Sequence, residues 1–210
     1  FIKDIGEGNT ISNYNYSLTL RKGLDGLFRY TEKDFNGNAE QKALSVNDLS
    51  EEGIQKYNEL VERINKVSAN ITISPIDIIK TRIKQAGFSV GELTGRSSEL
   101  QINDDGTATV IKRQDKDKKK LARDFNNGEI DVLILNQSAS TGISLHASKT
   151  FKDQRQRVML SAQTQLDVNT EVQMRGRIDR TGQVLRGAYR YLISPIPAEQ
   201  RLIMMFKAKL

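Results

Sequence analysis

Two arginines three positions apart carry the clearest chemical signal in this sequence. They are Arg177 and Arg180, in the stretch from Gln173 to Gln183 that reads Gln-Met-Arg-Gly-Arg-Ile-Asp-Arg-Thr-Gly-Gln. Residues three apart share one face of a helix, so this spacing predicts two adjacent guanidinium groups. Adjacent guanidiniums repel unless an anion lies between them, and arginine makes bidentate contacts to phosphate oxygens. A triphosphate is a natural candidate for this anion, but charge alone favours a solvated basic helix end, where cations interact well with the helix dipole.

A second polar stretch follows the most apolar run of the chain. Residues 130–135 read Ile-Asp-Val-Leu-Ile-Leu, which is typical of a strand buried on both faces. Residues 136–147 then read Asn-Gln-Ser-Ala-Ser-Thr-Gly-Ile-Ser-Leu-His-Ala. Ligands of open α/β sheets bind beyond the carboxyl ends of such strands, and small residues leave backbone N–H groups free to meet phosphate. A polar loop without a ligand is the alternative interpretation.

The elements that must position these two stretches alternate between helix and strand. Apolar periodicity and capping residues predict helices at residues 50–67, 74–87, 116–125 and 169–180, and a last helix from residue 197. The expected N-caps include Ser74 and Asn169. Short β-prone runs predict strands at residues 69–73, 88–93, 130–135, 157–161 and 189–193, and a hairpin at 99–113. This order favours an α/β fold with a mostly parallel sheet and helices on both faces, after an opening that includes an extended segment at residues 11–20.

The amino-acid composition limits the kinds of site and partner that this chain can have. The 210 residues contain no cysteine and one histidine, His146, which excludes disulfides, thiolate metal sites and a multi-histidine metal centre within this chain. The net charge of +6 is compatible with a nucleic-acid partner or with scattered surface charge. No apolar run approaches the ~18 residues of a membrane helix, so we expect a cytoplasmic protein with no membrane partner. The chain starts without methionine, and we expect it to be a piece of a longer protein.

Together, the two polar stretches resemble motifs V and VI of superfamily 2 helicases and translocases. The pattern Gln-x-x-x-Arg-x-x-Arg-x-Gly-Gln is the motif VI form of the Swi2/Snf2-like branch. Three features are more similar still to the strawberry-notch-like helicases, which include large phage and mobile-element proteins that join a methylase-like part to a helicase part. They are the stretch Ser140–Ala147, the strand near residues 157–160 and the sequence Glu199-Gln-Arg201. The resemblance covers residues 71–210, and we recognise no family in residues 1–67.

The resemblance implies that residues 68–210 form the second RecA-like domain of a two-domain motor, preceded by a partly helical extension at residues 1–67. ATP with Mg²⁺ would be bound mainly by the N-terminal RecA-like domain of the same protein, because no Gly-x-x-x-x-Gly-Lys-Ser/Thr loop occurs in this chain. By position in the motifs, Arg177 and Arg180 would be arginine fingers, and Gln173 would help to hold the cleft together.

Other motif positions acquire roles in the same way. Gly142 and Ser144 would lie near the ribose and the hydrolysis machinery, although Ser144 stands where many relatives carry Asp or Asn. DNA would cross the opposite surface of the domain, with RNA open as an alternative. Its backbone phosphates would contact residues of two loops, namely Thr94, Gly95, Arg96, Ser140 and Thr141.

Two conspicuous features receive no motif role. His146 is interpreted as a packing residue rather than a catalyst. The lysine run at residues 116–120 is interpreted as a solvated helix face, with a DNA contact as the alternative.

The sequence leaves three hypotheses about function. The leading hypothesis is the C-terminal motor half of an ATP-dependent DNA helicase or translocase. The main alternative is a RecA-like module that binds nucleic acid without hydrolysing ATP. A phosphate-binding α/β enzyme of another kind is the weakest, because the sequence offers no recognisable nucleophile and base for it.

Overall fold

A computed structural model describes residues 2–12, 14–33, 35, 37–68, 71–136, 142–163 and 167–209. The chain divides into two compact units. Unit 1 comprises Phe1–Ile79 and Ser98–Lys112, and unit 2 comprises Lys80–Ser97 and Arg113–Leu210. The boundary expected after residue 67 stays a prediction. The hairpin segment Ser98–Lys112, from the middle of the sequence, belongs to unit 1.

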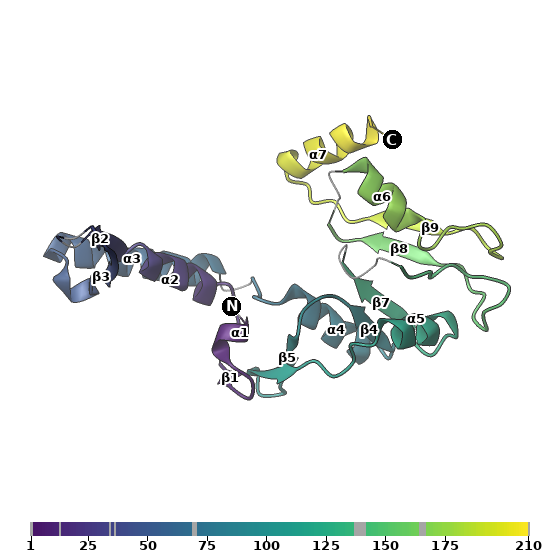
Figure 1. Ribbon diagram of the computed structural model, residues 1–210, viewed down its shortest axis with the longest axis horizontal. Coiled ribbons are helices and arrows are strands. Elements are labelled where there is room, and N and C mark those ends of the chain that lie inside the picture. The colour runs from purple at the N-terminus through teal and green to yellow at the C-terminus, as the bar shows by residue number, and fades with distance from the viewer. Residues whose placement is uncertain are drawn as a thin grey trace. The chain divides into compact units, whose positions relative to one another are not determined.

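Unit 1 is built from short helices and antiparallel strands (Figure 1). In chain order they are α1 (Ile2–Ile5), β1 (Thr10–Ile11), α2 (Ser17–Gly26), β2 (Arg29–Lys33), β3 (Ala39–Ala43), a 3-10 turn (Val46–Asp48), α3 (Glu51–Ser68), β5 (Ser98–Ile102) and β6 (Ala108–Lys112). The strands β1, β6 and β5 form an antiparallel sheet, and β2 pairs with β3. Leu100, Ala108 and Val110 are the buried centre of this unit.

Two predictions for unit 1 are confirmed and one is wrong in part. The hairpin expected at residues 99–113 is β5–β6, and Gly106 takes a positive φ of 80° in its turn. The helix expected at residues 50–67 is α3, where the Ser50 hydroxyl accepts a hydrogen bond from the Gly53 N–H at 3.2 Å. The segment at residues 11–20 is extended only at its start, because α2 begins at Ser17.

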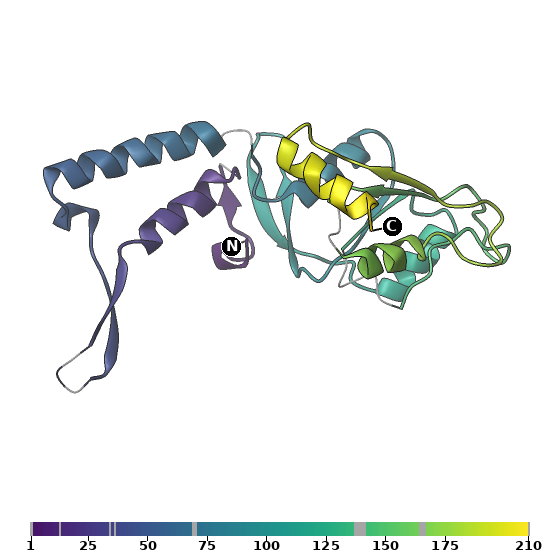
Figure 2. The same cartoon turned by 90° about the horizontal axis from the view of Figure 1, so that it is seen from above.

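Unit 2 contains the α/β part of the chain (Figures 1 and 2). The helix α4 (Pro75–Gln85) runs from unit 1 into it, and its other elements are β4 (Val90–Leu93), α5 (Lys118–Asn126), β7 (Val132–Leu135), β8 (Val158–Ser161), α6 (Val168–Arg175), β9 (Ala188–Tyr191) and α7 (Pro197–Lys207). The pairs β4–β7 and β8–β9 are both parallel. The predicted α/β class with parallel strands is therefore confirmed.

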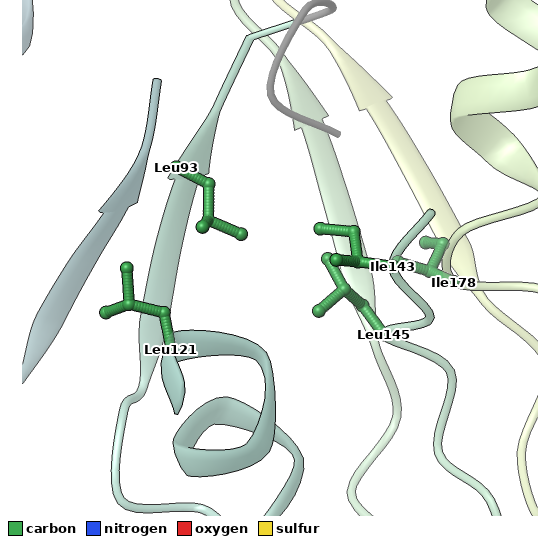
Figure 3. Close-up of a cluster of buried hydrophobic side chains, with 5 residues drawn as sticks. All are labelled: Leu93, Leu121, Ile143, Leu145 and Ile178. Carbon is green, nitrogen blue, oxygen red and sulfur yellow. The ribbon is translucent and has the colours of Figure 1, made fainter. Parts of the chain in front are cut away.

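The core of unit 2 draws on both polar stretches singled out above (Figure 3). Its buried side chains are Leu93 from β4, Leu121 from α5, Ile143 and Leu145 from the segment after β7, and Ile178 from the segment after α6. Gly91 allows α5 to approach β4, since an added Cβ would lie 3.1 Å from Leu121 and from two further side chains. Burial of these apolar side chains fixes where the two polar stretches lie.

Three predicted elements differ from those observed. The first is the strand at residues 69–73, whose described part makes only an isolated antiparallel bridge, Asn15↔Thr72, and is bonded to residues 14–16. The second is the strand at residues 130–135, which is half-buried as β7 rather than buried on both faces. The third is the helix at residues 169–180, which is α6 and is shorter. Its cap is Asp167, whose carboxylate accepts from the Thr170 N–H at 2.8 Å.

No helix in the described ranges combines the length and the apolar character needed to cross a membrane.

Candidate functional site

The segment after β7 and the segment after α6 lie against each other through backbone and side-chain hydrogen bonds. The Arg177 Nη1 donates to the carbonyl of Ile143 at 3.0 Å, and the Leu145 N–H donates to the carbonyl of Arg177 at 2.9 Å. Further along, the Val184 N–H donates to the carbonyl of Ala147 at 2.8 Å. The two stretches that the sequence marked as a pair are thus one structural site.

Arg177 and Arg180 do not lie on a helix, contrary to the prediction. The helix α6 ends at Arg175, with Gly176 at its C-cap, because glycine is a poor helix former and Ile178 is drawn into the core of Figure 3. The chain then turns, and the Arg180 Nε donates to the Gly176 carbonyl at 2.7 Å. Arg180 thereby satisfies one of the carbonyl groups that a helix end leaves without an intrahelical partner.

The two guanidinium groups are close enough to influence each other. Burial, and then the positive charge of Arg180, lower the pKa of Arg177. The Nε of Arg177 is buried and has no hydrogen-bond partner in the described part of the chain. Within those same residues, no carboxylate lies within ion-pair distance of either arginine. This arrangement suits an anion, since a buried donor without a partner costs free energy until an acceptor arrives.

The acid in the same stretch is engaged elsewhere. The Asp179 carboxylate accepts a hydrogen bond from Gln183 Nε2 at 2.5 Å and one from the Tyr189 hydroxyl at 3.4 Å. The Gln183 side chain also accepts from the Arg180 N–H at 2.8 Å. These bonds direct the Asp179 carboxylate toward Gln183 and Tyr189. Asp179 therefore forms no ion pair with Arg177 or Arg180 in the described residues.

The predicted nucleotide-side residues lie on two sequence segments, namely the segment after β7 and the helix α6. Gly142 is exposed with a positive φ of 80°, and Gln173 is exposed on α6. The Ser144 hydroxyl lies 2.6 Å from Nδ1 of His146, and the Ser144 carbonyl accepts from Asn126 Nδ2 at 3.0 Å. Asn126, at the end of α5, was not among the predicted site residues, and the sequence Asn-Asn-Gly at residues 126–128 is typical only of a helix end.

His146 is held as a packing residue would be. Its ring meets Phe151 at a centroid distance of 6.0 Å in an edge-on arrangement. Partial burial, followed by the charges of Arg180 and Arg157, lowers its pKa. The ring therefore favours its neutral form near pH 7.

A structural ion pair beside the site was also missed. The Arg175 Nε donates to Glu171 at 3.0 Å and to the Tyr191 hydroxyl at 3.0 Å, and its guanidinium lies 5.2 Å from the ring centre of Tyr189. Glu171 is only 1% exposed. These contacts fasten α6 to β9, and the four-residue spacing of Glu171 and Arg175 is the signal that could have revealed them.

Two of the predicted nucleic-acid residues that follow β4, Thr94 and Arg96, belong to a second cluster, centred on buried Glu92. Arg96 donates to both Glu92 oxygens at 2.6 Å, and the Thr94 hydroxyl also donates to this carboxylate. Arg113 Nη1 lies 3.0 Å and Lys80 Nζ 3.2 Å from it. The Thr94 and Arg96 side chains are therefore turned toward Glu92, while Gly95 is exposed. Ser140 and Thr141 lie outside the described residues.

Glu92 is ionised at every ordinary pH. Burial alone would raise its pKa, but the hydrogen bonds from Arg96 and Thr94 and the charges of Arg96 and Lys80 outweigh burial and lower the pKa to about 2. A permanent negative charge at this point holds several cations together at the carboxyl end of β4.

The sequence of this chain is similar to known proteins across both clusters. A family profile described as the C-terminal domain on Strawberry notch homologue, a helicase C-terminal domain, matches residues 77–210. Protein strawberry notch homolog 1 of Rattus norvegicus is 27% identical over 210 residues, covering 96% of this chain and 16% of the relative. Protein strawberry notch of Drosophila melanogaster is 29% identical over 162 residues, covering 73% and 10%. This chain thus spans about a sixth or less of these relatives' length.

Among solved structures, the C-terminal part of the Fun30 ATPase domain aligns with a TM-score of 0.45 and 19% identity, covering 64% of this chain and 36% of that one. The family profile spans both the Arg177–Arg180 site and the Glu92 cluster. The chain therefore belongs to the strawberry notch family, and residues 77–210 are its helicase-type C-terminal domain.

Proposed function

We propose that this chain is the C-terminal motor half of an ATP-dependent superfamily 2 DNA helicase or translocase. The observation that carries the proposal is the pair Arg177 and Arg180. Their guanidiniums lie near each other without a carboxylate partner in the described residues, and one of them has a buried N–H with no acceptor. A polyphosphate supplies the acceptors and the negative charge that this pair lacks.

The two arginines are held in different ways. Arg177 is half-buried and bonded to the Ile143 carbonyl, so it is fixed to the core of unit 2. Arg180 is exposed, and within the described residues its guanidinium donates only from Nε, to the Gly176 carbonyl, which leaves its two terminal nitrogens available to an anion. In the proposed role both stabilise the charge that develops on a phosphoryl group during hydrolysis. A group of this kind contributes roughly 10³–10⁵ in rate.

ATP with Mg²⁺, held mainly by the N-terminal RecA-like domain of the same protein, would supply the phosphoanhydride bond. From this chain, Gly142 and Ser144 would lie against the nucleotide and Gln173 would help to close the cleft. Gly142 fits such a position because, among the described residues, no atom lies within 4 Å of a Cβ added to it. Family membership supports the helicase-type context, and the remainder of the motor lies in the longer protein.

DNA is the proposed partner on the other surface, through Thr94, Gly95, Arg96, Ser140 and Thr141. In the structure, the exposed Gly95 offers its backbone at the carboxyl end of β4, while Glu92 holds Thr94 and Arg96 on either side of it. Contacts of this type recognise phosphate and carry little sequence preference. RNA is tested as an alternative substrate in the experiment below.

The test is nucleic-acid-stimulated ATPase activity of the full-length protein and its Arg180→Ala variant. Arg180 is the sharper choice, because removing Arg177 would also break its bond to the Ile143 carbonyl. We expect the variant to bind ATP and nucleic acid and to lose about 10³-fold or more in turnover. Arg186→Ala, an exposed arginine close in sequence, is the matched control and should retain full activity.

A contrary result has a defined meaning. If wild-type protein shows no ATPase activity with any DNA or RNA, the chain is part of a nucleic-acid-binding module that does not hydrolyse ATP. If Arg180→Ala matches Arg186→Ala in turnover, the arginine-finger assignment fails.

A further inference from the structure

One short segment of this chain is rich in lysine and strongly positive. Residues 113–123 carry six Lys and Arg against two Asp, a net charge of +4 within a chain whose total is +6. Four of these cations, Lys116, Lys118, Lys119 and Lys120, are exposed and are here called the lysine strip. In the described residues no carboxylate lies within ion-pair distance of the strip.

The fold gains nothing from cations at this place. The helix α5 starts at Lys118, so three of the four lysines lie in its first turn, at the positive end of the helix dipole. Cations are disfavoured there. Asp117 offsets part of the cost as the N-cap, since its carboxylate accepts from the Lys119 N–H at 2.9 Å and the Lys120 N–H at 3.2 Å. In the described residues, the lysines of the strip therefore neither form ion pairs nor stabilise the helix α5.

The Glu92 cluster places the strip beside the loop after β4. Arg113, which is only 5% exposed, donates through Nη1 to the carbonyls of Thr94 and Arg96, at 3.2 Å each. Its Nε donates to the carbonyl of Asp115 at 3.3 Å. The strip begins at the next residue, and Leu121 at its far end is buried in the core of Figure 3. Both ends of this short segment are thus fixed near the carboxyl end of β4.

We propose that the lysine strip binds the phosphodiester backbone of nucleic acid, extending the contact surface of Thr94–Arg96 along the N-terminal end of α5. This inference rests on the proposed function for its choice of partner. Lysine ammonium groups act as mobile point charges, which suits sequence-independent contact with a regular row of phosphates. The strip holds no apolar side chain between Asp115 and Leu121 that could enter a membrane, and no aromatic ring on which a base could stack.

The test is equilibrium binding of the full-length protein, without nucleotide, to labelled single-stranded DNA, duplex DNA and RNA of one sequence over a range of salt. The variant is Lys118→Gln/Lys119→Gln/Lys120→Gln. The control is Lys149→Gln/Lys152→Gln/Lys209→Gln, which removes the same charge from exposed lysines of the same unit. Each lost phosphate contact lowers the slope of log K against log[salt] by about 0.9 for duplex and about 0.7 for single strands.

We expect the strip variant to lose roughly two units of salt slope and about tenfold or more in affinity near 0.1 M salt, equally for unrelated base sequences. The control should keep the wild-type slope. The thermal midpoint of the strip variant should equal or exceed that of wild type, because the lysines oppose the helix dipole. A purely structural role would lower this midpoint instead.

Several outcomes would overturn the inference. An unchanged slope in the strip variant, an equal loss in the control, or a lower thermal midpoint would each remove the strip as a binding surface and leave the proposed motor function standing. Absence of nucleic-acid binding by wild-type protein would instead remove the nucleic-acid side of the proposed function, and the strip with it.

Discussion

Glu92 shows how a single buried carboxylate organises its surroundings. Its side chain is 3% exposed and lies within ion-pair distance of Lys80, Arg96 and Arg113. Three cations around one carboxylate would repel one another strongly if that carboxylate were neutral. Glu92 is not proposed to contact ATP or nucleic acid, yet it determines where Arg96 and the segment after Arg113 lie.

Replacing Glu92 by Gln should destabilise the protein by about 3–5 kcal/mol, because it leaves buried cations without their counter-ion. Glu129→Gln, an exposed glutamate, is the control and should cost less than about 0.5 kcal/mol. Urea unfolding at pH 7 measures both. Equal midpoints for the two variants would contradict the assigned role of Glu92.

The same residue predicts a dependence of stability on pH. Its pKa is lowered from 4.5 to about 2 in the folded protein, so its stabilisation is complete above pH 4.5 and is lost as the pH falls toward 2. The shift corresponds to about 3 kcal/mol. Urea titrations at steps between pH 5 and pH 2.5 should show a steeper loss for wild type than for Glu92→Gln. If the stability of wild type and of Glu92→Gln falls in parallel with pH, the lowered pKa of Glu92 is contradicted.

At the scale of elements, the ends of helices and the approach of a helix to a strand set the site. The helix α6 stops before Arg177, so a turn rather than a helix face presents the two arginines. The helix α5 lies close to β4 because position 91 carries no side chain, and this approach puts Leu121 into the core that Ile143 and Ile178 share. The end of α6 and the close approach of α5 to β4 thus both shape the site.

Gly91→Ala should therefore cost about 1–3 kcal/mol, since its methyl group would press on Leu121, Ile130 and Leu133 at 3.1 Å. Gly23→Ala provides a control with the opposite sign. That glycine is inside α2 with nothing within 4 Å of an added Cβ, and the substitution should stabilise by about 0.5–1 kcal/mol. Thermal unfolding of both variants measures these changes in stability. A stabilised Gly91→Ala variant would show that α5 can move away from β4 without loss of stability.

At the scale of the whole molecule, this chain carries one side of the proposed ATP site. It brings Arg177 and Arg180, while its 210 residues contain no Gly-x-x-x-x-Gly-Lys-Ser/Thr loop to hold the phosphates of ATP. The relatives are six or more times longer than the matched region. On the proposed function, catalysis belongs to the longer protein and not to either compact unit described above.

The purified 210-residue chain should accordingly show no ATP hydrolysis above background, with or without DNA, whereas the full-length protein should be active. A coupled assay of phosphate release measures both, and the Arg180→Ala form of the 210-residue chain reveals contaminating ATPases. Turnover by the isolated chain that disappears in this variant would show that the chain holds a complete site by itself.

The sequence by itself determined the alternation of helices and strands, the hairpin β5–β6 and the cap at Ser50. These features depend on periodicity, turn chemistry and motif spacing within a few neighbouring residues, so they can be read locally. The roles given to Arg177, Arg180 and the DNA-contacting residues remain predictions, because they concern molecules outside the chain.

Only the tertiary structure decided that α6 ends at Arg175, that residues 71–73 pair with residues 14–16, and that Thr94 and Arg96 turn toward Glu92. Each outcome depends on partners far away in sequence. Ile178 leaves the helical path because burial beside Ile143 and Leu145 outweighs the continuation of a helix beyond a glycine. Such competition between local preference and distant contacts is settled when the core packs.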